Sequence, residues 1–201
     1  MDTPRRLAQV LEGIDQLNGK DPNTEIVAGA SHPRELLYAK RLSDWVLRLS
    51  PEASEELRIA ARGQHVCRWT IPRSRYEMNR QGYLRWRETL KAFHSQTVAA
   101  LMHDAGYPEA SIERVRTIMS KRRLQEDPDT QTLEDALCLI FLETQFADLR
   151  KKTAPEKMRG ILTKTWQKMS QRGRIHALKL PLSAEERQLL TQAISGSTSP
   201  R

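Results

Sequence analysis

Along most of the chain, apolar residues recur every three or four positions, which is the spacing of one face of an α-helix. In the stretch 33–49, for example, Leu36, Ala39, Leu42 and Val46 fall on one side. Sustained alternation of apolar and polar residues, the pattern of strands, is absent from the sequence. Gly, Pro, Asn and Asp separate the helical stretches. The pattern predicts helices over residues 5–17, 33–49, 50–69, 82–104, 111–123, 132–152, 154–169, 175–180 and 184–194.

Helix boundaries and the most apolar stretch predict how the helices are arranged. Ser50 followed by Pro51 is a typical N-terminal cap, so we expect the third helix to begin there. The stretch 132–152 is the most apolar and should form the central helix. We therefore predict an all-α fold, a single-domain bundle of seven to nine helices over residues 1–195, followed by a disordered tail at 196–201.

The charge balance and the cysteine content limit the classes of partner and compartment. The chain has 33 Lys and Arg against 25 Asp and Glu, a net charge of +8, which favours phosphates, nucleotides or RNA as partners. Cys67 and Cys138 stand in apolar stretches, so we expect buried free thiols rather than a disulfide. No apolar stretch approaches the ~20 residues of a membrane helix, and we recognise no signal peptide. We expect a cytoplasmic protein without a membrane partner.

The motif LMHDAGY at 101–107 resembles the His-Asp doublet of the HD phosphohydrolases. In that family, His and Asp side chains from separate helices hold metal ions that activate water against a phosphate ester. Here Gly106 ends a helix directly after the doublet, so His103 and Asp104 should lie in solvent. No suitable acid follows at the family's spacing. We interpret this doublet as an exposed helix end.

A second set of residues follows the HD order better. His65 takes the place of the doublet's His; Glu35 lies 30 residues before it and Asp135 lies 70 after it. Val66 stands where the family has the doublet's Asp, so a two-metal centre is not expected. We predict one divalent ion (Mn, Mg, Fe or Zn) on His65 and Asp135. Glu35, His65 and His94 are the predicted catalytic residues.

Five stretches resemble the family known as domain of unknown function 4202: PRELLYAKRLSDW, LRIAARGQHVCRWTIPRSRYEMNRQGYLRWR, KAFHSQ, QTLEDALCLIFLE and ILTKTWQKMS. The resemblance covers nearly the whole chain, but it implies little chemistry because the family has no settled activity. His32, 33 residues before His65, is the alternative to Glu35 at the place of the HD family's first His, and the resemblance favours Glu35. The residues that it implies as part of the family pattern are Glu35, His65, Arg68, Trp69, Arg73, Trp86, Arg87, His94, Glu134 and Asp135.

Arginine and aromatic residues crowd the segment 62–87. Arginine binds phosphate in a bidentate manner, and aromatic rings stack on bases. We predict that Arg68, Trp69, Arg73 and Lys121 bind a phosphorylated substrate.

Two functions stay open at this level. The first is a metal-dependent phosphohydrolase acting on a nucleotide or another phosphate ester, with an HD-like fold. The second is a non-catalytic protein on the same scaffold that binds a nucleotide or RNA. RNA is the less favoured ligand because no RNA-binding motif is present.

Overall fold

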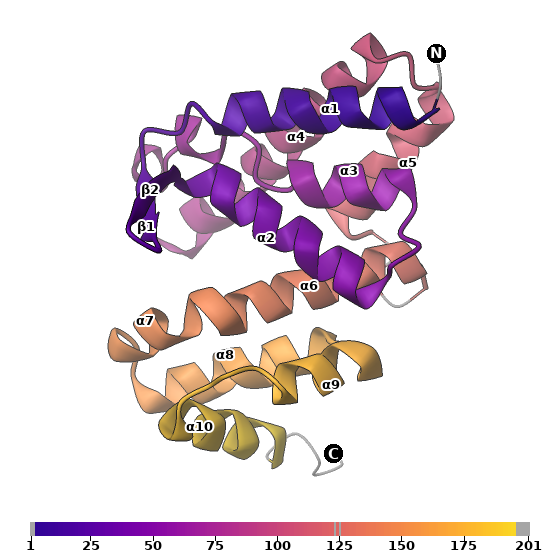
Figure 1. Cartoon of the computed structure of the whole chain (residues 1–201). Coiled ribbons are helices and arrows are strands. Elements are labelled where there is room, and N and C mark those ends of the chain that lie inside the picture. The colour runs from indigo at the N-terminus through magenta and orange to yellow at the C-terminus, as the bar shows by residue number, and fades with distance from the viewer. Residues whose placement is uncertain (1–2, 123, 125, 196–201) are drawn as a thin grey trace.

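The computed structural model describes residues 3–122, 124 and 126–195, and the predicted tail at 196–201 lies outside them. The described residues form an all-α domain with ten α-helices, where the sequence predicts seven to nine (Figure 1). None of these ten is long and apolar enough to cross a membrane. They are α1 (Thr3–Asn18), α2 (Arg34–Leu49), α3 (Glu55–Gly63), α4 (Arg80–Asp104), α5 (Glu109–Ser120), α6 (Pro128–Thr144), α7 (Phe146–Lys151), α8 (Pro155–Lys168), α9 (Gln171–Leu178) and α10 (Ala184–Ser195).

The most apolar stretch forms the central helix, as predicted. Helix α6 packs against α2, α3 and α5 on one side and against α8 and α9 on the other (Figure 1). Leu133, Leu139 and Ile140 of this helix have no exposed surface. The predicted helix is divided at Gln145, after which α7 continues as a separate short helix.

The third helix begins later than the sequence predicts. Ser50 instead ends α2, and its backbone N–H donates to the carbonyl of Val46. Helix α3 starts at Glu55, where the Ser54 hydroxyl accepts a hydrogen bond of 3.1 Å from the backbone N–H of Leu57. Two serines four residues apart carry the same capping signal, and the local sequence does not distinguish them.

Helix α3 also ends earlier than predicted, and this places His65 on a turn. At Gly63 a Cβ would lie 2.3 Å from Val98 Cγ2, so only glycine lets α3 approach α4 this closely. Cys67 has a φ of 52°, a left-handed conformation that interrupts a helix. Its N–H donates to Asn18 Oδ1 at 3.0 Å. The predicted continuous helix is therefore wrong, and the turn shapes the site.

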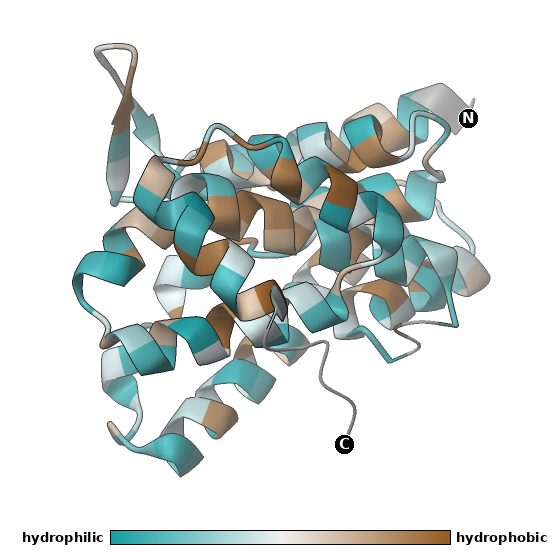
Figure 2. Cartoon of the chain, turned by 90° about the horizontal axis from the view of Figure 1, so that it is seen from below, coloured by the Kyte–Doolittle hydropathy of each residue, from teal (hydrophilic) through white to brown (hydrophobic). Residues whose placement is uncertain are grey.

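A two-stranded hairpin, which the sequence pattern did not predict, precedes α2. Strands β1 (Thr24–Val27) and β2 (Ala30–Pro33) pair antiparallel. The turn residues Ala28 and Gly29 have φ of 50° and 80°, the left-handed conformation that a two-residue hairpin turn requires. Four-residue strands are too short to give a recognisable alternation. The hairpin projects from the helices and leads directly into Glu35 at the start of α2 (Figure 2).

Candidate functional site

Glu35 lies in the first turn of α2. Its backbone N–H donates to Asp21 Oδ2 at 3.0 Å, so the loop before the hairpin fixes the start of this helix. The residue is 8% exposed, and its Oε2 has no hydrogen-bond partner among the described residues. Burial raises the pKa of Glu35 to about 7, although the nearby Arg68 guanidinium opposes this shift. A carboxyl group with this pKa exchanges protons near neutral pH.

His65 lies on the turn after α3, beside Glu35. Its Nδ1 is 3.5 Å from Glu35 Oε2, and its ring stacks on Tyr38 with the centroids 4.4 Å apart. Burial lowers the pKa of His65 well below its usual range, and the positive charges of Arg68 and Lys121 act in the same direction. The imidazole is therefore neutral at pH 7.

His94, the third predicted catalytic residue, lies on α4 with its ring centroid 6.0 Å from that of His65. It is 4% exposed, and its Nδ1 is 2.7 Å from the carbonyl oxygen of Val66. Because a carbonyl only accepts, Nδ1 carries the hydrogen and Nε2 is an acceptor. Burial, followed by the effect of His65, lowers the pKa of His94 to about 3. The structure thus brings Glu35, His65 and His94 together, while their catalytic role stays a prediction.

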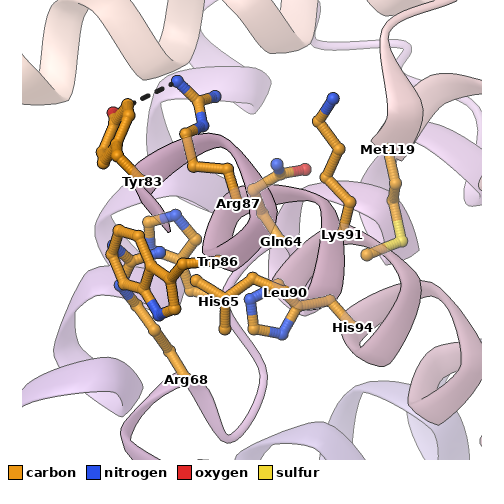
Figure 3. Close-up of a pocket in the computed structure, with 10 residues that line it drawn as sticks. All are labelled: Gln64, His65, Arg68, Tyr83, Trp86, Arg87, Leu90, Lys91, His94 and Met119. Atoms are coloured by element: carbon orange, nitrogen blue, oxygen red, sulfur yellow. Dashed lines mark hydrogen bonds between the residues drawn. The ribbon is translucent and has the colours of Figure 1, made fainter. Parts of the chain in front are cut away.

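A cavity of about 240 Å³ lies between the N-terminal half of α4 and the turn after α3 (Figure 3). Three cationic side chains line it, Arg68, Arg87 and Lys91, and no carboxylate of the described residues does so. The neutral imidazoles of His65 and His94 and the side-chain amide of Gln64 complete its polar wall. The lining therefore carries a positive charge that is complementary to an anion.

Aromatic rings hold two of these cations in place. The Arg68 guanidinium lies 4.7 Å from the ring centroid of Trp86, and no described residue accepts a hydrogen bond from it. Arg87 lies over the Tyr83 ring at 5.9 Å and makes a long hydrogen bond of 3.5 Å to its hydroxyl. Cation–π contacts leave the N–H groups at the edge of a guanidinium available to another acceptor. Both arginines therefore keep donors for a ligand.

Asp135, the predicted metal ligand on α6, lies against the start of α9. Its Oδ1 accepts hydrogen bonds from the Ser170 backbone N–H at 2.8 Å and from Gln131 Nε2 at 3.0 Å. Its Oδ2 accepts from the Ser170 hydroxyl, and a Cβ at Gly173 would lie 2.6 Å from its Cγ. Asp135 does not line the cavity. Its contacts instead anchor the N-terminus of α9.

Lys121 and Arg73, both predicted to bind substrate, are engaged by the protein itself. Lys121 forms an ion pair with Glu134. Arg73 donates to three backbone carbonyls of its own loop, at 2.6, 2.9 and 3.2 Å, and so holds that loop together. Trp69 lines a different, more open cavity, which shares only Arg68 and Trp86 with the first. Of the predicted substrate-binding residues, only Arg68 lines the cationic cavity.

The side chains around His65 do not fit the predicted divalent metal ion. Within the part of the chain that the structure describes, no group of three or more His, Cys, Asp or Glu side chains could hold a metal. Arg68 and Lys121 add positive charge near His65 instead. His103 and Asp104 are exposed at the end of α4, as the sequence predicts, and supply no ligand to the site. We assign no step at this site to a metal.

Of the α4 wall of the cavity, the predicted site residues include only His94, although the family pattern also contains Trp86 and Arg87. The helical spacing contains a signal for it, because one face of a helix repeats every three to four residues. Tracing the face of His94 back by 3, 4, 7, 8 and 11 positions gives five lining residues: Lys91, Leu90, Arg87, Trp86 and Tyr83. Gln64 and Met119 complete the lining from other elements, and this helix face does not predict them.

The chain matches one protein family, and the match contains every residue of the cavity. No curated protein and no solved structure matches the chain. The family is described as Domain of unknown function (DUF4202), and it matches residues 8–190. Because this range includes most of the chain, the protein belongs to the DUF4202 family.

Proposed function

We propose that the chain binds a phosphorylated small molecule, specifically a nucleotide, in the cavity between α4 and the turn after α3. The observation that carries this proposal is the positive charge of the lining. Arg68, Arg87 and Lys91 line the cavity, and none of the described residues that line it has a carboxylate. Arginine donates two parallel hydrogen bonds to phosphate oxygens, and lysine adds a point charge. Of these three cations, only Lys91 pairs with a carboxylate of the described residues, the exposed Glu88 at 2.7 Å.

The aromatic side chains favour a nucleotide over a simple phosphate. Tyr83 and Trp86 line the same cavity with centroids 6.0 Å apart, and Tyr83 is 42% exposed. An exposed ring beside bound phosphate provides a surface on which a base can stack. The volume of about 240 Å³ lies just below the range of about 300–1,000 Å³ typical of ligand pockets, which favours a mononucleotide.

The contact between Glu35 and His65 supports a second candidate function, hydrolysis of the bound phosphate ester. In that reaction a water oxygen attacks phosphorus while the bond from phosphorus to the ester oxygen breaks. Glu35 takes the water proton through His65 and returns it to the departing ester oxygen, which leaves as an alcohol. The pKa of about 7 suits Glu35 to this role near neutral pH. The predicted HD-like nature of the fold and the catalytic role of His94 belong to this second candidate.

Calorimetric titration with inorganic phosphate, the four ribonucleoside monophosphates and a short single-stranded RNA tests the proposal. Arg87→Met should weaken nucleotide binding by about tenfold, because a charge-assisted hydrogen bond is lost. Arg85→Met is the matched control: Arg85 lies on the same helix, is exposed and pairs with Glu77, so its loss should leave affinity unchanged. Equal loss in both variants, or tight binding of RNA alone, would contradict a mononucleotide site.

Phosphate release from the same nucleotides separates the two candidates. Turnover by the wild type that Glu35→Gln abolishes, at unchanged nucleotide affinity, would establish hydrolysis. Binding without turnover would leave the chain a nucleotide-binding protein.

A further inference from the structure

The wall of the cationic cavity contains two buried hydrogen-bond acceptors without partners. His94 Nε2 has no hydrogen-bond partner among the described residues, and neither has Gln64 Oε1. Both residues line the cavity, His94 from α4 and Gln64 from the turn after α3 (Figure 3). His94 is 4% exposed, so its polar atoms are largely removed from bulk solvent. A buried polar atom without a partner costs free energy, and a donor group on a ligand bound in the cavity would remove that cost here.

The tautomer of His94 fixes the kind of group that its unpaired nitrogen requires. The hydrogen of this imidazole is on Nδ1, because Nδ1 contacts the carbonyl oxygen of Val66 at 2.7 Å. Nε2 therefore only accepts a hydrogen bond, as Gln64 Oε1 does. A phosphate monoester that has lost both protons, the main form at pH 7, also only accepts, so it satisfies neither atom. The partner must be a different part of the ligand, one that bears an O–H or N–H group.

We infer that the cavity recognises two groups on one ligand, a phosphate at Arg68, Arg87 and Lys91, and a hydrogen-bond donor at His94 and Gln64. This inference rests on the proposed phosphate binding and deepens it. It selects phosphorylated molecules that carry a hydroxyl or amino group, and it makes His94 a residue that determines specificity. In a nucleotide the donor is either an amino group of the base or a hydroxyl of the ribose.

Three ligands that differ only in their donors test the inference. Adenosine 5′-monophosphate has both kinds of donor; purine riboside 5′-monophosphate lacks the amino group, and 2′,3′-dideoxyadenosine 5′-monophosphate lacks the ribose hydroxyls. Removing the recognised donor should weaken binding to the wild type by roughly tenfold, because the buried acceptors then stay unpaired. Whichever analogue shows the loss identifies the source of the donor.

Two variants connect that loss to the named atoms. In His94→Asn, the side-chain amide can still donate to the Val66 carbonyl, but no acceptor remains at the position of Nε2. Gln64→Met has a similar length and no acceptor. In either variant, adenosine 5′-monophosphate and the weaker analogue should bind with affinities within about twofold of each other. The acceptor is then missing from the protein, so the donor on adenosine 5′-monophosphate no longer gains a hydrogen bond. Thermal unfolding of both variants checks that they are folded.

The outcomes separate this inference from the proposed function. If the three ligands bind the wild type equally, the inference is wrong while phosphate binding stands. If the tenfold preference persists unchanged in both variants, the donor is recognised elsewhere and the inference is again wrong. If neither inorganic phosphate nor any of the three ligands binds, the proposed function fails, and the inference fails with it.

Discussion

Two of the regions that contain buried polar side chains treat them differently. At the junction of α6 and α9, both oxygens of Asp135 accept hydrogen bonds, and Ser170 both donates to it and caps α9. Around the cavity, by contrast, Glu35 Oε2 and His94 Nε2 are buried without a hydrogen bond to any described residue. The first region is a closed network, and the second is an open one.

This difference indicates which buried polar residues stabilise the fold and which await a ligand. A satisfied network rigidifies the structure and contributes to stability, whereas unpaired buried groups cost free energy in the absence of a partner. Asp135 therefore belongs to the first class, although its position in the sequence resembles that of a metal ligand. Glu35 and His94 belong to the second class.

The largest expected effect concerns acid stability through His94. Its pKa is about 3 in the folded protein and near 6.5 when unfolded, so the unfolded chain binds more protons between these values. The contribution of His94 to stability is therefore fully present above pH 6.5 and is lost as pH falls toward 3, by about 1.4 kcal/mol per pH unit and roughly 5 kcal/mol in total. Urea unfolding at a series of pH values measures this loss.

His94→Asn isolates this contribution from the neighbouring groups. His65 has a lowered pKa and acts in the same direction, whereas Glu35, with its pKa raised to about 7, gains stability as pH falls from 7 to 4.5. These two groups remain in the variant. As pH falls from 6 to 4, the free energy of unfolding of the variant should therefore rise relative to that of the wild type by about 1.4 kcal/mol per pH unit. Parallel pH curves would show that His94 does not titrate as its burial requires.

The next effect concerns the closed network. Asp135→Ala should lower the free energy of unfolding by about 3 kcal/mol, because Ser170 and Gln131 lose their acceptor. Nucleotide affinity should not change in this variant, since Asp135 does not line the cavity. Chemical denaturation and calorimetric titration measure the two quantities. A loss of nucleotide affinity at unchanged stability would instead support the predicted role of Asp135 as a metal ligand in the site.

The pattern of apolar residues predicts the helical fold well because it directly records which faces are buried. Helix α2 was predicted at 33–49 and occurs at Arg34–Leu49, and the most apolar stretch is central. The pattern gives the wrong helix end where a single residue determines the backbone conformation. Gly63 ends α3 against Val98, and Cys67 reverses the chain in a left-handed conformation. Both features depend on tertiary contacts that periodicity does not contain.

Spacing along the chain placed Glu35, His65 and His94 near one another, but it did not predict that Asp135 contacts the start of α9. Adjacent residues of a helix point about 100° apart, so an error of one position changes which neighbour a side chain meets. On α6 it is Glu134 that pairs with Lys121, while Asp135 faces α9. Sequence spacing fixes the helix on which a residue lies, but helix packing decides which way the residue faces.

The smallest effects come from two glycines in the C-terminal helices, and they should have opposite signs. Gly173→Ala places a Cβ 2.6 Å from Asp135 Cγ, so the carboxylate must move and the protein should lose about 2 kcal/mol of stability. Gly160 lies inside α8 with nothing within 4 Å of an added Cβ, so Gly160→Ala should gain roughly 0.5–1 kcal/mol from helix propensity. Thermal unfolding of the two variants distinguishes these signs. Equal stabilisation by both substitutions would mean that Asp135 does not need its tight contact with α9. The closed network at α6 and α9 would then not be a source of stability, which would contradict the comparison of the two regions.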